Sequence, residues 1–167
     1  MTIILKNKET LIFDEFTFKC SIGSSGTTKM KIEGDKKTPI GIFSLGNLLY
    51  RIDRHTVPST KLKCNPIKKE MGWCNDIKSK KYYNKLIKIK KNLQHEKLYR
   101  RDYKYDFLIP INYNTKNTKI GRGSGIFLHL TKKYNPTAGC ITLQKKDFLI
   151  LLKLINKNTK IKIAQPL

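Results

Sequence analysis

One histidine and one cysteine within residues 121–143 have the side chains and the spacing for nucleophilic chemistry. His129 lies in a short apolar run that predicts a β-strand, and Cys140 follows eleven positions later, after a turn-forming stretch that contains Asn135 and Pro136. A strand that leaves the core, turns and returns would bring the imidazole to the thiol. That proximity is what an activated cysteine nucleophile requires.

A neighbouring imidazole activates a thiol by taking its proton and remaining as a cation beside the thiolate. His129 is the candidate base for Cys140. The cysteine lies just before a predicted helix, so backbone N–H groups of residues 139–141 would face the oxyanion that forms when a carbonyl is attacked. Gly139 would let the backbone approach closely. From the residues alone, the alternative is that Cys140 is a buried structural cysteine and that His129 is a core histidine with hydrogen-bonded ring nitrogens.

The rest of the chain predicts a mainly β fold with one amphipathic helix. Phe148, Leu151, Leu152 and Ile155 recur at the spacing of one helical face. We therefore expect a single domain over residues 1–167, a β-sandwich or open barrel with this helix packed against it after the cysteine. Alternating or β-branched runs predict extended segments at residues 2–5, 10–19, 29–33, 41–45, 48–53, 103–112, 125–130 and 161–163, and residues 93–101 predict a short helix.

The composition fits one domain and favours polyanionic partners. At 167 residues the chain is long enough to bury a core. Its 35 Lys and Arg residues against 12 Asp and Glu residues give a formal charge of +23, which attracts nucleic acid, anionic lipid or an acidic envelope polymer. Charge alone does not choose among these partners.

Cysteine usage and the N-terminal residues exclude several classes of protein. The four cysteines form no CxxC pair, so a zinc ribbon or a thioredoxin-like site is not indicated, and we expect no metal and no cofactor. Residues 1–16 interrupt their apolar run with charges and lack the small-residue cleavage site of a signal peptide. No stretch is long enough to span a membrane. The oligomeric state stays open.

Three other features have both a structural and a functional interpretation. His55 stands among charged residues, which favours a solvated surface histidine over a ligand or a base. Trp73 favours packing, although its Gly, Asn and Asp neighbours would also suit a turn at the rim of a cleft. Residues 78–91 hold seven lysines and two tyrosines but no recognition motif, which favours a solvated surface over a nucleic-acid site.

Several short motifs resemble those of one enzyme family. The residues FLH at 127–129 and YNPTAGC at 134–140 resemble the catalytic segment of L,D-transpeptidase (YkuD-type) domains, and more specifically a short bacterial branch with GRGSxIFLH and PTxGC motifs. The resemblance extends over most of the chain in the same order. It includes EGD at 33–35, TPxG at 38–41, YRxDR at 50–54, GWCxD at 72–76, Tyr105-Asp106 and Asn112.

The resemblance implies a cysteine enzyme acting on peptidoglycan stem peptides. Cys140 would attack the carbonyl of the third residue, expel the terminal D-amino acid and form an acyl-enzyme. His129 would act first as base and then as acid, with a backbone carbonyl fixing its tautomer, and Thr137 and Gly139 would border the oxyanion and the substrate. An amine from a second stem would complete a cross-link, whereas water would make the protein an L,D-carboxypeptidase. A basic, non-catalytic binder of a polyanion or nucleic acid is the alternative from a different class.

The family activity implies a place in the cell envelope or periplasm, where anionic envelope polymers are further partners. Because no signal peptide is recognised, a cytoplasmic location stays open, and nucleic acid is not the expected partner.

Two positions depart from the better-known members of this family. Those members have Ser-His-Gly-Cys and an Arg two positions after the cysteine, whereas this chain has Ala138 and Thr142 in place of the His and the Arg. Binding of the substrate carboxylate therefore needs another residue, for which Arg122 is the candidate. The interval between His129 and Cys140 is also shorter than in those members, which predicts a reduced loop over the cleft.

Overall fold

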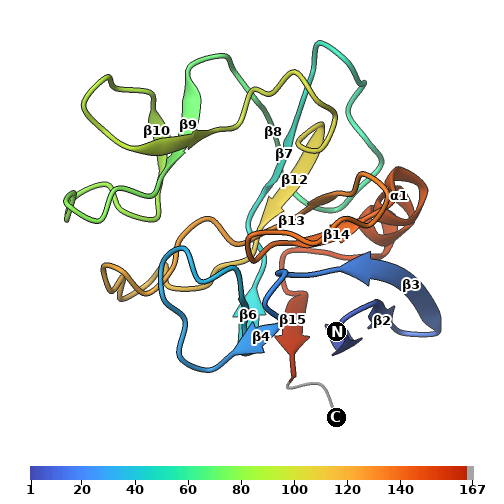
Figure 1. Ribbon diagram of the computed structural model, residues 1–167. Coiled ribbons are helices and arrows are strands. Elements are labelled where there is room, and N and C mark those ends of the chain that lie inside the picture. Colours follow the sequence, from blue (N-terminus) through green and yellow to red (C-terminus); the bar gives the residue numbers. More distant parts are fainter. Residues whose placement is uncertain (165–167) are drawn as a thin grey trace.

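The computed structural model describes residues 1–164 and consists mainly of strands around one helix (Figure 1). A large sheet of ten strands curls around the main core, which confirms the predicted β-rich fold with a single amphipathic helix. Its strands are, in spatial order, β6 (Gly41–Ser44), β15 (Lys160–Ile163), β1 (Thr2–Asn7), β2 (Thr10–Phe13), β3 (Phe16–Ser21), β14 (Ile141–Leu143), β13 (Phe127–Leu130), β12 (Phe107–Pro110), β7 (Leu48–Tyr50) and β8 (Cys64–Pro66). A short pair, β4 (Thr27–Thr28) and β5 (Thr38–Pro39), lies apart from this sheet.

Strands β1 and β15 show how side-chain alternation builds one half of the sheet. They run parallel, with Ile3 opposite Ile161 and Leu5 opposite Ile163. All four side chains are buried, while the intervening lysines of β15 are exposed. Alternation of this kind fixes the register, because a slip by one residue would turn every apolar side chain to solvent.

The helix α1 (Lys145–Leu154) covers the core beside the central strands. Phe148, Leu151 and Leu152 are buried, as the spacing of the apolar residues predicts. Asp147 in the first turn and Lys153 in the last turn complement the helix dipole. The helix ends at Ile155, whose backbone N–H donates to the Leu151 carbonyl.

The parallel pair of β13 and β14 determines the position of the two candidate catalytic residues. His129 lies opposite Thr142, and Leu128 lies opposite Ile141, which is the first residue of β14. Cys140 comes directly before it in the chain. The prediction that Cys140 lies just before the helix was wrong, because β14 separates the cysteine from α1. The extended residues after the cysteine complete the sheet between β3 and β13 instead.

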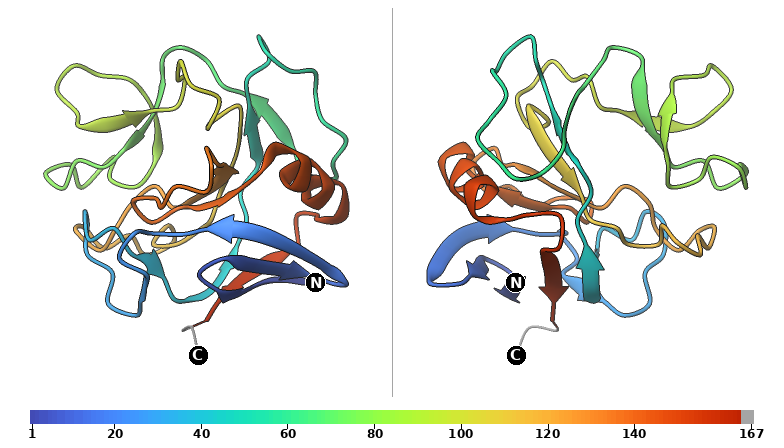
Figure 2. Two further views of the ribbon diagram at one scale, coloured as in Figure 1. Left: turned by 45° about the vertical axis from the view of Figure 1, so that its right-hand side comes forward. Right: turned by 180° about the vertical axis from the view of Figure 1, so that it is seen from behind.

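A second, three-stranded sheet stands on the other side of the central strands from α1, as the three views agree (Figures 1 and 2). Its spatial order is β10 (Leu86–Lys88), β9 (Met71–Cys74) and β11 (His95–Lys97). Trp73 of β9 meets Phe127 of β13 edge-on, with ring centroids 5.1 Å apart. This contact belongs to a smaller hydrophobic cluster that also contains Cys140.

Two of the predicted elements were wrong. A long-range strand pairing explains one of them, and a local turn explains the other. Residues 93–101 form no helix, because Glu96 pairs with Trp73 as part of β11. Residues 29–33 form a bend and a turn rather than a strand, because the Asp35 carboxylate accepts hydrogen bonds from the backbone N–H groups of Ile32 and Lys37. Other strands are shorter than predicted, and β12 spans only Phe107–Pro110.

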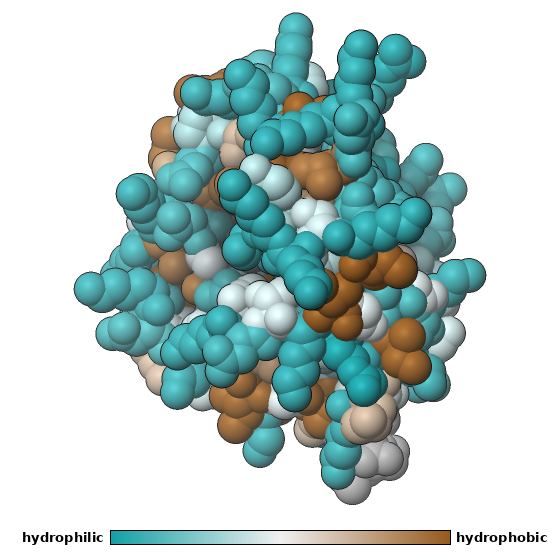
Figure 3. All heavy atoms as spheres, turned by 90° about the vertical axis from the view of Figure 1, so that its left-hand side faces the viewer, coloured by the Kyte–Doolittle hydropathy of each residue, from teal (hydrophilic) through white to brown (hydrophobic). Residues whose placement is uncertain are grey.

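The lysine-rich residues 78–91 include β10 of the small sheet and the turn before it. Its seven lysines are exposed, as predicted for a solvated surface, but Tyr83, Asn84 and Ile87 of the same segment are buried. Figure 3 views the molecule from the left of Figure 1 and shows a face covered largely by hydrophilic side chains, with small apolar groups between them. No helix within residues 1–164 has both the length and the apolar character needed to cross a membrane.

Phe148 provides a test of this packing. Its side chain is 1% exposed and stacks near Phe107 at 6.2 Å between ring centroids. We expect Phe148→Ala to lower the free energy of unfolding by about 3–5 kcal/mol, because it leaves a cavity beneath the helix. Urea unfolding measures this change. Ile42→Ala, at a residue that is 61% exposed, is the matched control and should cost less than about 0.5 kcal/mol; equal losses would contradict the described core.

Candidate active site

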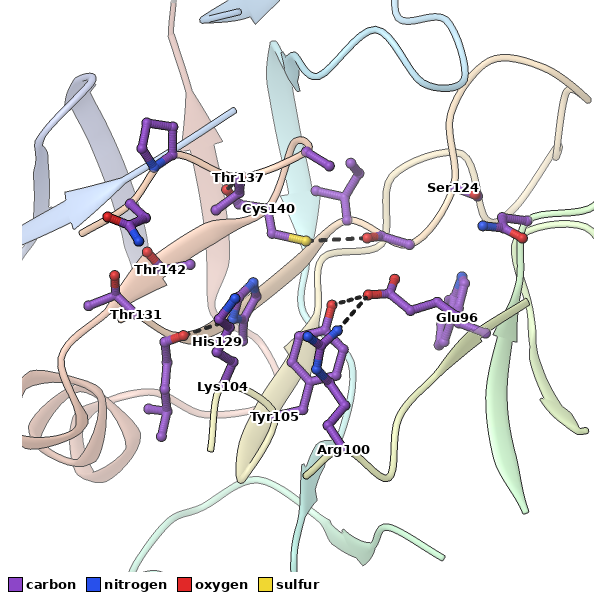
Figure 4. A pocket seen from close by; sticks show the side chains of 18 of the residues that line it. Glu96, Arg100, Lys104, Tyr105, Ser124, His129, Thr131, Thr137, Cys140 and Thr142 are labelled. Atoms are coloured by element: carbon purple, nitrogen blue, oxygen red, sulfur yellow. Dashed lines mark hydrogen bonds and ion pairs between the residues drawn. The ribbon is translucent and has the colours of Figure 1, made fainter. Parts of the chain in front are cut away.

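A cavity of about 370 Å³ lies between the central strands and the small sheet. Both His129 and Cys140 line it, and Figure 4 shows their side chains at the same pocket, His129 on β13 and Cys140 directly before β14. Thr137, Ala138 and Thr142 contribute to the same wall. The structure thus brings together the two residues that the sequence singles out, together with the residues of the turn before the cysteine.

His129 is held in one tautomer by the backbone. Its Nδ1 lies 2.9 Å from the carbonyl oxygen of Leu130. Because a carbonyl only accepts hydrogen bonds, Nδ1 carries the hydrogen and Nε2 keeps a free lone pair. Tyr105 packs against the imidazole ring at 4.9 Å between centroids with an angle of 78°. The imidazole therefore has a defined orientation and one nitrogen that can accept a proton.

Burial keeps the His129 imidazole neutral. Only 6% of the residue is exposed. Desolvation is the main cause that lowers its pKa to about 4, and the positive charges of Arg100 and Lys104 act in the same direction. Hydrogen bonding to the backbone of Leu130, and to a smaller extent of Lys104, opposes this shift. At neutral pH the ring is a base without a proton on Nε2.

Cys140 sits in a pocket of backbone groups. Its Sγ donates to the Gly125 carbonyl at 3.4 Å and accepts from the Phe127 N–H at 3.3 Å. Burial raises the pKa of the thiol to about 12, and the negative charge of Glu96 adds to the rise. The Phe127 N–H opposes the rise because it stabilises the thiolate.

The resting pair is therefore a neutral thiol and a neutral imidazole. Within residues 1–164, no hydrogen bond joins the Cys140 Sγ to the His129 ring, because the thiol donates to Gly125 instead. A preformed thiolate–imidazolium pair is not the state that this geometry describes. A thiol in this state becomes a strong nucleophile only when it loses its proton, and a neutral imidazole nitrogen can accept one.

The turn before Cys140 is fixed by Thr137 and Gly139. The Thr137 hydroxyl donates to the Cys140 carbonyl at 2.6 Å and accepts from the Gly139 N–H at 3.0 Å. Gly139 has φ of 141°, and a Cβ there would lie 2.8 Å from the Lys37 carbonyl oxygen. Its own N–H is used by Thr137, whereas the Cys140 N–H donates to no acceptor within residues 1–164. The Cys140 N–H is thus the free donor beside the sulfur.

The structure does not bring Arg122 into this cavity. Arg122 is exposed and is not among the residues that line the cavity. Its backbone carbonyl oxygen accepts a hydrogen bond from the Tyr113 hydroxyl. Arg100 and Lys104 line the cavity beside His129 instead. The residue at the position of the family Arg, Thr142, bonds to the Ser21 hydroxyl at 2.6 Å. Lys31 and Lys132 line the cavity as well, so positive charge reaches it from several segments of the chain.

Several residues of the site were not predicted as a group. Glu96 accepts a hydrogen bond from the Tyr105 hydroxyl and lies 3.7 Å from the Arg100 guanidinium. Glu33 accepts from the hydroxyls of Tyr83 and Ser124. The motif residues Glu33 and Tyr105 were signals in the sequence, but nothing there indicated that Glu96 would join them.

Two of the ambiguous residues are now placed. Trp73 packs on Phe127 and also lines the cavity, so both of its interpretations hold. His55 was expected to be solvated, but its Nε2 lies 2.7 Å from a carboxylate oxygen of Asp106, and its ring stacks on Phe107. His55 does not line the cavity. It packs against β12 through Phe107.

The fold and the cavity together define a β domain in which a cysteine and a histidine line one pocket. A family model described as the L,D-transpeptidase catalytic domain (YkuD) matches residues 1–163. The chain therefore belongs to the L,D-transpeptidase family, as the motifs predict.

One solved structure with a similar fold is that of the helical cell shape determining protein Pgp2 from Campylobacter jejuni. The two share a TM-score of 0.54 at 19% sequence identity. The match covers 99% of this chain and 48% of the Pgp2 chain, so this chain spans about half the length of that protein. No curated protein matches the sequence.

Burial of His129 predicts a loss of stability at acidic pH. The folded protein holds this pKa at about 4, whereas the ordinary value is 6.5. Between these pH values the unfolded chain binds a proton that the folded chain does not. The free energy of unfolding therefore falls by up to about 1.4 kcal/mol for each unit by which the pH is lowered. Above this range the residue contributes no pH dependence.

Urea unfolding at several pH values between about 7 and 4 measures this slope. His129→Gln removes the titrating group and should flatten the slope by that amount. A slope that is the same in His129→Gln and the native protein would show that His129 is not the buried, neutral residue described above.

Proposed function

We propose that this chain is an L,D-transpeptidase that cross-links peptidoglycan stem peptides through an acyl-enzyme at Cys140. The supporting observation is the pairing of β13 with β14, which presents a tautomer-fixed imidazole and a buried thiol to one cavity. Residues 1–167 would act as one catalytic domain. No metal or cofactor is needed for this chemistry, because the thiol supplies the nucleophile and the imidazole supplies the base.

The first half of the reaction forms a thioester. As the Cys140 Sγ bonds to the carbonyl carbon of the third stem residue, its proton passes to Nε2 of His129. The Cys140 N–H donates to the resulting oxyanion. When the tetrahedral intermediate collapses, its C–N bond breaks, and His129 returns the proton to the departing D-amino acid.

The second half transfers the acyl group. The amine of a second stem attacks the thioester and gives a proton to His129, and the sulfur leaves and regains that proton. An amide cross-link and the free thiol result. Water in place of the amine would give a shortened stem, which is the L,D-carboxypeptidase outcome.

Membership of the family supports the proposed substrate and its location. Peptidoglycan stem peptides are the proposed partner, which places the activity in the cell envelope. Pgp2 is described as a determinant of helical cell shape, and we extend the theme of cell shape and cell-wall formation to this chain as part of the proposal. The formal charge of +23 would favour retention on anionic envelope polymers.

Lys104 is the cation that we propose for the substrate carboxylate, with Arg100 beside it. Both line the cavity, and both lower the pKa of His129 through their charge, which reflects their proximity to the ring. Arg100 already forms ion pairs with Asp102 and Glu96, whereas Lys104 takes part in no ion pair among residues 1–164. Lys132 also lines the cavity without an ion pair among these residues, but of the two lysines only Lys104 acts on the His129 ring through its charge, which makes Lys104 the better candidate for the carboxylate.

Disaccharide-tetrapeptides test the reaction itself, with products identified by mass spectrometry. Cross-linked dimers would support transfer, and tripeptides alone would replace it with hydrolysis. Unchanged substrate, with binding only to polyanions, would favour the non-catalytic alternative.

We expect Cys140→Ser to reduce product to background and His129→Ala to slow turnover by roughly 10²–10⁴-fold. Cys64→Ser is the matched control, because this partly exposed free thiol lies outside the cavity and should leave the rate unchanged.

Recognition of the carboxylate gives a separate prediction. Lys104→Ala should raise KM for the tetrapeptide by about tenfold, because an interaction between charged groups is lost. kcat should change little, since the lysine is not a proton-transfer group. Arg122→Ala removes a cation outside the cavity and should leave both constants unchanged. The assignment fails if Arg122→Ala raises KM and Lys104→Ala does not.

A further inference from the structure

Two backbone groups define the position of the Cys140 thiol, and both belong to the segment that leads into β13. The thiol donates to the Gly125 carbonyl at 3.4 Å and accepts from the Phe127 N–H at 3.3 Å. His129 makes no hydrogen bond to it among residues 1–164. Whatever holds Gly125 and Phe127 in place therefore holds the sulfur in place.

Gly125 is anchored by Asn84. The Gly125 N–H donates to Asn84 Oδ1 at 2.9 Å. Gly125 has φ of 60°, a left-handed conformation that suits glycine, and a Cβ on it would lie 3.4 Å from the Trp73 ring. The glycine is thus enclosed between the asparagine amide and the indole.

The Asn84 side chain joins three separate segments. Its Oδ1 also accepts from the Trp73 indole N–H at 2.9 Å, and its Nδ2 donates to the carbonyls of Tyr113 and Asn114 at 3.0 and 2.8 Å. Asn84 is 4% exposed, and this set uses both donors and both acceptor positions of the amide. Few side chains other than Asn combine this pattern with the left-handed φ of 57°.

The second contact of the thiol, with the Phe127 N–H, depends on Trp73 and Asn84. Phe127 donates its N–H to the sulfur, and its ring meets the Trp73 ring edge-on at 5.1 Å. Trp73 in turn is held by Asn84. Asn84 does not line the cavity, so it would act on the nucleophile without touching a substrate.

We propose that Asn84 is a positioning residue for the nucleophile, acting through Gly125 and Trp73 to set the place of the Cys140 thiol. This proposal rests on the proposed function in one respect, namely that Cys140 is the nucleophile. Its consequence is that the small sheet and the turn before β10 are part of the catalytic machinery, and not an appendage of the large sheet.

Asn84→Gly is the direct test, because glycine keeps the left-handed backbone and removes only the amide. We expect kcat to fall by about 10- to 100-fold, since a nucleophile displaced by about 1 Å loses its alignment. KM should stay within about twofold, because no substrate contact is removed. A loss confined to KM would contradict a positioning role.

Alkylation of Cys140 by iodoacetamide provides a second readout that needs no substrate. In the native protein the buried thiol should react slowly at pH 8. Asn84→Gly should increase this rate severalfold, because the sulfur is released from Gly125 and Phe127, so alkylation rises while turnover falls. Mass spectrometry locates the adduct. Cys20, buried in β3, reports global unfolding and should remain unmodified.

Asn114→Gly is the matched control. Asn114 is also left-handed, with φ of 53°, and its amide ties Lys119 and Gly123 in the same loop without contacting Gly125. Asn114→Gly keeps the backbone carbonyl that accepts from Asn84 and removes only the Asn114 amide, so its turnover and Cys140 alkylation should stay near the native values. Equal effects of the two substitutions would overturn the proposal, because loop order in general would then explain them. Native rates in folded Asn84→Gly would overturn it as well.

Hydrogen exchange of the native protein covers the case in which Asn84→Gly fails to fold. The Gly125 amide should exchange slowly, because Asn84 accepts its hydrogen. Rapid exchange would overturn the proposal. Alkylation and exchange both remain valid if no stem peptide is turned over, so a failure of the proposed function is distinguishable from a failure of this inference.

Discussion

The register between β13 and β14 is the constraint on which the rest of the site depends. Because Leu128 lies opposite Ile141, the residue before β14 is placed beside Phe127, and its thiol enters the wall that also holds His129. The connection between the two strands is short and crosses the end of β3, where Thr137 bonds to the backbone of Ile22. This compact crossover explains why the thiol and the imidazole line one cavity although the strands are parallel.

Burial decides the chemistry of the pair. Desolvation raises the pKa of Cys140 to about 12 and lowers that of His129 to about 4, so both groups rest in their neutral forms. A buried neutral thiol is protected from adventitious oxidation and alkylation, but it must lose its proton during the attack. The Phe127 N–H and the free N–H of Cys140 are the donors that would stabilise the charges formed at that moment.

Sequence reasoning identified the elements that depend on local pattern. The helical face of Phe148, Leu151 and Leu152 was predicted because its spacing is a property of ten consecutive residues. His129 and Cys140 were predicted because their motifs are local too. Residues 93–101 were misread as a helix because the partner of Glu96, Trp73, lies 23 positions upstream and local propensity contains no trace of it.

The same limit applies to the outer part of the site. Arg122 was chosen for its charge and its position near the motif, yet the loop that carries it leaves the side chain exposed. Asn84 was overlooked because it stands among lysines and tyrosines in a segment that reads as surface. Only the three-dimensional structure shows that its amide is buried and that it contacts Trp73 and Gly125. Support for a nucleophile is a long-range property, which a single sequence does not encode locally.

Peptide mapping of an acid-quenched reaction tests the central claim most directly. The protein is mixed with a tetrapeptide donor without an acceptor amine, quenched within seconds, digested at low pH and analysed by mass spectrometry. We predict a tripeptidyl thioester on Cys140, with one D-amino acid released for each adduct, and no adduct on Cys64. Product formation with the adduct elsewhere, or with no adduct on Cys140 at any time, would contradict the account.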